Sequence, residues 1–149
     1  MRLMRRKIDD FLKEWKENED RLPLVVKGAR QIGKTASIMQ FANDNYKNVV
    51  AINFVLQQKF KSIFDDGYDV DSVVRNITLI DPSIELEPGN TIFFFDEMQD
   101  CPVCATSLKA FKIDGRYDVV CSGSLMGINY QEIESNSVGY KEDYTMPVS

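Results

Sequence analysis

The chain has 149 residues, of which 44% are hydrophobic and 28% are charged, and its net charge at pH 7 is −5. This length suits one domain with a single core, and the composition excludes a disordered or fibrous protein. The negative charge disfavours non-specific nucleic-acid binding, and the lack of any histidine excludes histidine bases and histidine-ligated metals. Any chemistry must therefore use carboxylates, lysines, hydroxyls or thiols.

Two further features bear on where the protein works. Apolar runs such as Ile92–Phe95 are far shorter than the ~20 residues of a membrane-spanning helix, and no apolar signal segment follows the basic N-terminus. The odd number of cysteines fits a reducing compartment, so we expect a cytoplasmic protein without membrane contact. Cys101 and Cys104 form a C-x-x-C, which suits a redox pair or half a zinc site, but two incidental thiols fit better because only Cys121 remains as a further ligand.

The N-terminal part of the chain predicts a helix, a strand, a loop and a second helix. Within residues 1–20, apolar side chains recur at i, i+3, i+4 and i+7, which predicts an amphipathic helix that packs on the domain. Leu22–Val26 predicts a buried strand, and Gly28–Thr35 is a glycine-bearing loop. Apolar residues between 36 and 42 then predict a helix that ends near 43–45.

Strands and helices continue to alternate through the rest of the chain. The predicted elements are a strand at Val49–Val55, helical segments within 57–79 broken at 65–67, a central strand at Thr91–Phe95, a helix at Ser107–Ile113 and a strand at Tyr117–Cys121. This alternation is typical of a parallel sheet covered by helices on both faces. No repeat or linker divides the chain, so we expect a single domain over residues 1–149.

The glycine-bearing loop carries the strongest motif. It matches G-x-x-x-x-G-K-[ST] at every fixed position and lies between a predicted strand and a predicted helix. Such a loop directs backbone N–H groups at one point, where the positive end of the helix dipole also lies, and therefore binds polyphosphate. Its glycines permit close approach or unusual backbone angles. The predicted nucleotide-binding residues are Gly28, Ala29, Arg30, Gln31, Ile32, Gly33, Lys34 and Thr35.

Side chains at the end of this loop have distinct predicted roles. Lys34 brings a positive charge to the β- and γ-phosphates, in binding and in catalysis, and the Thr35 hydroxyl takes one position on Mg²⁺. Arg30 and Gln31 occupy variable positions of the motif, so we expect their side chains at the surface rather than on phosphate.

A pair of acidic residues follows the central strand directly. Asp96 and Glu97 are thereby placed at the carboxyl edge of the sheet, where ligands bind in open α/β folds. Asp96 is the predicted metal ligand, and Glu97 is the predicted catalytic base that accepts a proton from an attacking water. A base beside the metal aspartate favours water over a hydroxyl substrate as acceptor. For Gln99, ordering of the water, phosphate sensing and structural packing all remain open.

The segment Cys121–Ser124 ends the predicted strand that follows. If this strand lies between those of the loop and the acids, a hydroxyl at its tip faces the γ-phosphate. Ser122 and Ser124 are therefore candidate catalytic sensors, with a simple Ser- and Gly-containing turn as the equal alternative.

The motifs GARQIGKT, IFFFDEMQ and CSGS, in this order and spacing, resemble those of bacterial and archaeal AAA+ ATPases whose ATPase domain precedes a C-terminal domain of unknown role. The resemblance spans residues 22–144. It implies a P-loop NTPase three-layer sandwich, a mostly parallel sheet in the order 5-1-4-3-2 with its fifth strand near Tyr140–Met146, and ATP and Mg²⁺ as ligands. It also implies the roles given above for Lys34, Thr35 and the acidic pair.

Proteins of this kind continue beyond the nucleotide domain, so we expect this chain to lack the helical lid and the domain that follows. No arginine occurs after Arg116, and an arginine finger is worth about 10³ to 10⁵ in rate. We therefore expect an ATP-binding AAA+ domain with weak Mg²⁺-dependent hydrolysis, part of a motor or switch that acts on an unidentified protein partner or self-associates. The alternative is a nucleotide-dependent protein-interaction module without significant turnover.

Overall fold

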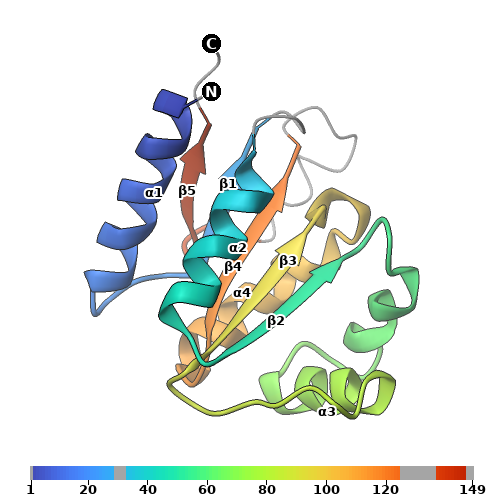
Figure 1. Cartoon of the computed structure of the whole chain (residues 1–149). Helices are drawn as coiled ribbons and strands as arrows, with labels where there is room; N and C mark the ends of the chain where they lie inside the picture. The colour runs from blue at the N-terminus through green and yellow to red at the C-terminus, as the bar shows by residue number, and fades with distance from the viewer. Residues whose placement is uncertain (1, 29–32, 125–136, 147–149) are drawn as a thin grey trace.

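The computed structural model describes residues 2–28, 33–124 and 137–146, with the side chains of 2–6 left aside. A sheet of five parallel strands has helices on both faces (Figure 1). Its order, β2-β3-β4-β1-β5, is the predicted order 5-1-4-3-2 counted from the other edge, so the predicted fold is confirmed. The strands are β1 (Leu24–Lys27), β2 (Asn48–Asn53), β3 (Thr91–Asp96), β4 (Asp118–Gly123) and β5 (Glu142–Thr145).

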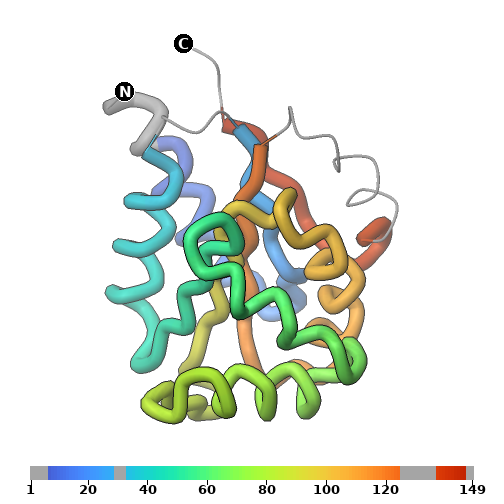
Figure 2. The backbone as a smooth tube through the Cα atoms, turned by 90° about the vertical axis from the view of Figure 1, so that its right-hand side faces the viewer, coloured from blue at the N-terminus to red at the C-terminus, as the bar shows by residue number. Residues whose placement is uncertain are grey.

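Alternating side chains of β3 explain the three layers. All residues of β3 are buried, because Ile92 and Phe94 belong to the core on one face and Phe93 and Phe95 to the core on the other. The first core packs against α1 (Arg2–Glu17) and α2 (Lys34–Asn45). The second packs against the 3₁₀ helix η1 (Gln58–Phe64), α3 (Val70–Ile80) and α4 (Val103–Asp114). The view in Figure 2 shows α2 and α4 on opposite sides of the strands.

The predicted amphipathic N-terminal helix is confirmed as α1. Its apolar side chains Ile8, Leu12 and Trp15 are buried in the core shared with α2. The Trp15 indole also donates a 2.8 Å hydrogen bond to the carbonyl of Leu22, just before β1. Within the described ranges, no helix is both long and apolar enough to span a membrane.

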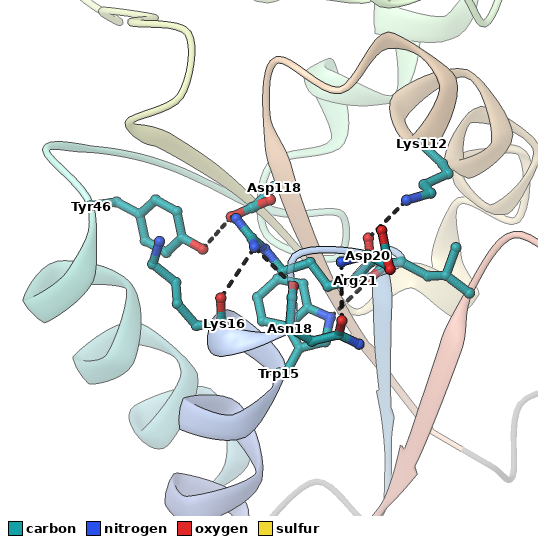
Figure 3. A network of polar contacts seen from close by, with 9 residues as sticks. Trp15, Lys16, Asn18, Asp20, Arg21, Tyr46, Lys112 and Asp118 are labelled. Atoms are coloured by element: carbon teal, nitrogen blue, oxygen red, sulfur yellow. Dashed lines mark hydrogen bonds and ion pairs between the residues drawn. The ribbon is translucent and has the colours of Figure 1, made fainter.

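A polar network fixes the end of α1 at the amino edge of the sheet (Figure 3). Asp118 at the start of β4 accepts hydrogen bonds from the Arg21 guanidinium at 2.8 Å and from the Tyr46 hydroxyl at 2.5 Å. Arg21 also donates to the carbonyls of Lys16 and Asn18. Burial and the neighbouring Asp118 carboxylate raise the pKa of Tyr46 far above its ordinary value. This network joins α1, α2 and β4 at the end of the sheet opposite to the predicted site.

Two helical predictions differ from the structure in extent. The segment predicted as mostly helical over 57–79 is a 3₁₀ helix, η1, followed by α3, whose first turn is capped by the Asp69 carboxylate accepting from the Ser72 N–H at 3.1 Å. The helix predicted at Ser107–Ile113 begins earlier, at Val103, because Pro102 fits the first turn of a helix, where no N–H is needed.

The strand predicted at Tyr117–Cys121 also differs in extent. β4 begins at Asp118 and continues through Ser122 to Gly123. Ser122 is therefore a buried residue of the central sheet rather than part of a turn.

Candidate active site

The predicted site residues that the structure describes meet at the carboxyl edge of the sheet. Here β1 leads to Gly28, β3 ends at Asp96, and β4, which lies between these two strands, ends at Gly123. Helix α2 begins at Lys34, so its N-terminus lies at the same edge. The predicted loop residues 29–32, including Arg30 and Gln31, lie outside the described part of the chain.

The two glycines of the loop are required for different reasons. A Cβ built on Gly28 would lie 2.9 Å from the Met146 Cβ, closer than side-chain carbons pack. The approach is fixed because the Met146 N–H donates to the Lys27 carbonyl at 2.8 Å, continuing the pairing of β1 with β5. Gly33 has φ 74° and ψ 14°, a left-handed conformation from which α2 starts. One glycine thus permits close packing, and the other permits the backbone turn.

Lys34 connects the ends of two strands. Its side chain is almost completely buried, with 2% exposure, and its ammonium donates to the Gly28 carbonyl at 2.9 Å and the Gly123 carbonyl at 3.0 Å. The positive charge is therefore held at the carboxyl edge between β1 and β4 by neutral backbone acceptors.

Asp96 is surrounded by hydrogen-bond donors. Its Oδ2 accepts from the Thr35 hydroxyl at 3.2 Å, and its Oδ1 accepts from the Ser122 hydroxyl at 2.5 Å and from the Glu97 N–H at 2.9 Å. The Asp96 side chain is buried, and Ser122 is fully buried. The predicted metal ligands Thr35 and Asp96 thus lie together although 61 positions separate them in the sequence.

This donor set fits Mg²⁺, which prefers hard oxygen ligands and retains several waters. Across the described ranges, no three side chains of His, Cys, Asp or Glu form a group that could hold a metal ion. A cation between Thr35 and Asp96 would therefore depend on water and phosphate oxygens for its remaining ligands, which is how Mg²⁺ is bound in nucleotide sites.

The two serines predicted as sensors occupy different positions. Ser122 lies inside β4 and donates to the Asp96 carboxylate. This hydrogen bond orients the predicted metal ligand. Ser124 follows the strand, and its backbone N–H donates to the Gln99 side-chain oxygen at 3.2 Å. A sensor role for either hydroxyl remains a prediction.

Glu97 adopts an unusual backbone conformation. With φ 57° and ψ 48°, it is the one non-glycine residue of positive φ in the described part of the chain. The left-handed conformation costs about 1–2 kcal/mol for an L-residue and often marks a functional position. A short 3₁₀ turn, η2 (Met98–Asp100), follows, and the Glu97 carboxylate accepts a 2.5 Å hydrogen bond from the Gln99 amide. Sequence reasoning found Gln99 but left its role open, because a contact within a tight turn has no local pattern.

The cysteines take no part in this site. Cys101, Cys104 and Cys121 are free, buried thiols in the core between the sheet and α4. Burial raises the pKa of the Cys101 thiol to about 11 and that of Cys104 well above its ordinary value. At neutral pH the Cys101 and Cys104 thiols are therefore protonated, and they pack as small apolar groups.

The model of a family described as an AAA domain matches residues 20–148. Similar folds occur in C. elegans PCH-2 (TM-score 0.55, 14% identity, 97% of this chain and 43% of that chain) and in the Aeropyrum pernix ORC1 protein in complex with DNA (TM-score 0.58, 12% identity, 99% and 45%). The Holliday junction branch migration motor RuvB of Thermotoga maritima is also similar (TM-score 0.53, 14% identity, 94% and 44%).

At these identities the structural likeness concerns the fold alone, and this chain spans less than half the length of those proteins. No curated protein matches the sequence. The family model covers most of the chain, and its AAA domain agrees with the strand order and with Gly28, Lys34, Thr35 and Asp96 gathered at one sheet edge. The chain therefore belongs to the AAA domain family and has the fold of its nucleotide-binding module.

Proposed function

We propose that this chain binds ATP with Mg²⁺ at the Gly28–Thr35 loop and hydrolyses it slowly, as the nucleotide module of a larger motor or switch protein. One observation carries the proposal: the Thr35 hydroxyl lies 3.2 Å from the Asp96 carboxylate. Thr35 belongs to the phosphate-binding motif and Asp96 ends strand β3, so the two side chains meet at the sheet edge where nucleotides bind in such folds.

The phosphate-binding groups are the backbone amides of the loop, the N-terminus of α2 and the Lys34 ammonium. Lys34 now donates to two neutral carbonyls at 2.9 and 3.0 Å. Phosphate oxygens are stronger acceptors because they are charged, so the ammonium can exchange these carbonyls for the β- and γ-phosphates. Mg²⁺ held by Thr35 and Asp96 would neutralise the charge that develops on these phosphates.

Glu97 supplies the base for hydrolysis. Its carboxylate follows the metal ligand directly and accepts a proton from water while the water oxygen bonds to the γ-phosphorus. The bond from that phosphorus to the bridging oxygen breaks, and ADP and inorganic phosphate leave. The left-handed backbone at Glu97 supports this role because strain of this kind is retained where a side chain must be aimed.

We expect slow turnover by this chain alone, because no arginine of the described residues lies where it could stabilise the charge on the γ-phosphate. Arg21 and Arg116 precede β1 and β4 at the amino edge and bind Asp118 and Asp71 there, and Arg75 donates to a serine of its own helix. A stabilising arginine would have to come from outside the described part of this chain, and its contribution is about 10³- to 10⁵-fold.

The test is a titration with a fluorescent ATP analogue and Mg²⁺, together with phosphate release. Lys34→Ala is expected to weaken binding by more than about 10-fold, since a charged hydrogen bond contributes roughly 1.5–3 kcal/mol. Glu97→Gln is expected to bind ATP normally and to lose turnover. Equal affinity of Lys34→Ala and the unchanged chain, or full turnover in Glu97→Gln, would refute the proposal.

One observation favours the alternative, a nucleotide-dependent interaction module. Leu56 is 79% exposed on the segment after β2, close to Asn53, which pairs with Asp96 in the sheet register. The Leu56 N–H donates to the Asn53 side chain at 3.0 Å, so a partner that contacts Leu56 would lie near the carboxyl edge of the sheet and its affinity can depend on nucleotide occupancy. In sedimentation experiments with Glu97→Gln, association in ATP but not in ADP, lost in Leu56→Ser, would support it. A monomer in every nucleotide would exclude self-association.

A further inference from the structure

The Gln99 side chain connects two functional parts of the site. Its Nε2 donates to the Glu97 carboxylate at 2.5 Å, and its Oε1 accepts from the Ser124 N–H at 3.2 Å. The two partners fix the orientation of the amide, because a carboxylate only accepts and a backbone N–H only donates. The one side-chain amide therefore supplies both the donor for Glu97 and the acceptor for Ser124.

The packing around Gln99 is specific to this arrangement. Gln99 is buried, with 8% exposure, and a Cβ on Gly123 would lie 3.1 Å from its Oε1 and 3.0 Å from the Met98 Cγ. Gly123 does not have a positive φ, so its backbone conformation does not require glycine. Glycine is needed here because a side chain would collide with Met98 and Gln99 of the η2 turn. The end of β4 is therefore shaped to receive the Gln99 side chain.

The same end of β4 also contacts the phosphate-binding lysine. The Gly123 carbonyl accepts from the Lys34 ammonium at 3.0 Å and from the Gly28 N–H at 3.3 Å. The adjoining residue, Ser124, holds Gln99. When Lys34 exchanges a carbonyl for phosphate, the β4 end that positions Gln99 loses one of its contacts.

We infer that Gln99 is a positioning residue that holds the Glu97 carboxylate in place and links its position to the end of β4 that Lys34 contacts. This inference rests on the proposed hydrolysis by Glu97. Gln99 touches the base and not the reacting atoms, so it acts through Glu97. Loss of the amide lowers the rate of the chemical step and leaves nucleotide binding intact.

Steady-state ATP hydrolysis and fluorescent-nucleotide binding test the inference in the full chain. Gln99→Glu keeps the shape and the acceptor for Ser124 but replaces the donor with a charge that repels Glu97. We expect kcat to fall about 10- to 100-fold, as for a displaced catalytic group, with KM and nucleotide affinity unchanged within about 2-fold. Gln40→Glu, an exposed position on α2, adds the same charge and is expected to behave as the unchanged chain.

Two further variants separate positioning from stability. In a Glu97→Gln background, Gln99→Ala is expected to leave the small residual single-turnover rate unchanged, because both changes act on one group. Gln99→Glu is also expected to lower the thermal unfolding midpoint. The double variant Glu97→Gln, Gln99→Glu restores a pair of one amide and one carboxylate, so it should recover this midpoint while steady-state turnover stays absent.

The outcomes distinguish this inference from the proposed function. Normal kcat in Gln99→Glu and Gln99→Ala, or effects that multiply with that of Glu97→Gln, would overturn the inference alone. Absence of turnover in the unchanged chain would overturn the proposed hydrolysis and this inference with it.

Discussion

Replacement of Ser122 by alanine tests the arrangement around Asp96. The Ser122 hydroxyl is fully buried and donates to the Asp96 carboxylate at 2.5 Å. A hydrogen bond to a charged group contributes about 1.5–3 kcal/mol, and removal leaves Asp96 with the Thr35 hydroxyl and the Glu97 N–H. We therefore expect Ser122→Ala to lower the free energy of unfolding by about 1.5–3 kcal/mol.

The chain offers a matched control in Ser107. This serine is also fully buried, and its hydroxyl donates at 2.6 Å to the Cys104 carbonyl, a neutral acceptor. Ser107→Ala should cost only about 0.5–1.5 kcal/mol. Urea unfolding at pH 7, followed by circular dichroism, would measure both stability losses. Nucleotide binding of each variant would be titrated with Mg²⁺ and with EDTA.

The two variants should also differ in function. Ser122→Ala leaves Asp96 less firmly oriented, so it should weaken the Mg²⁺-dependent part of ATP affinity and leave the affinity in EDTA unchanged. Ser107→Ala should change neither. Equal stability losses together with equal Mg²⁺ dependence would refute the view that Ser122 orients the metal ligand.

Further predictions concern the loop glycine, the amino edge and the thiols. Gly28→Ala should lose about 1–3 kcal/mol of stability and weaken ATP binding because its Cβ meets Met146, whereas Gly115→Ala, in open space at φ 75°, should leave ATP binding unchanged. The free energy of unfolding should fall as pH rises above about 10, because Tyr46 ionises there in the unfolded chain, whereas burial and Asp118 raise the pKa of the folded phenol. This fall should be smaller in Tyr46→Phe. Equal pH slopes in the two proteins would contradict this prediction. Cys101 and Cys104 should react with a thiol reagent at pH 8 only after unfolding, and rapid labelling of the native chain would disprove their burial.

The phosphate loop and the central strand were predictable because each has a local pattern. The loop motif fixes its residue types by their contact with phosphate, and Thr91–Phe95 is apolar on both faces because the strand is covered on both sides. The strand order came from family resemblance, since pairing between distant strands leaves no local pattern. The sheet then brings Asp96 to Thr35.

The details that escaped prediction depend on contacts between distant residues. Ser122 and Gly123 look like turn residues, yet they belong to β4 because they pair with Val26 and Lys27 of β1. The left-handed conformation of Glu97 is likewise invisible in the sequence, because glutamate does not favour it and the turn that follows imposes it.

A crystal structure of the Glu97→Gln variant with ATP and Mg²⁺ would show where the nucleotide and its metal ion bind. We expect the γ-phosphate on the Lys34 ammonium and the metal ion between the Thr35 hydroxyl and the Asp96 carboxylate. A triphosphate bound elsewhere, or a metal ion without contact to either oxygen, would contradict this expectation.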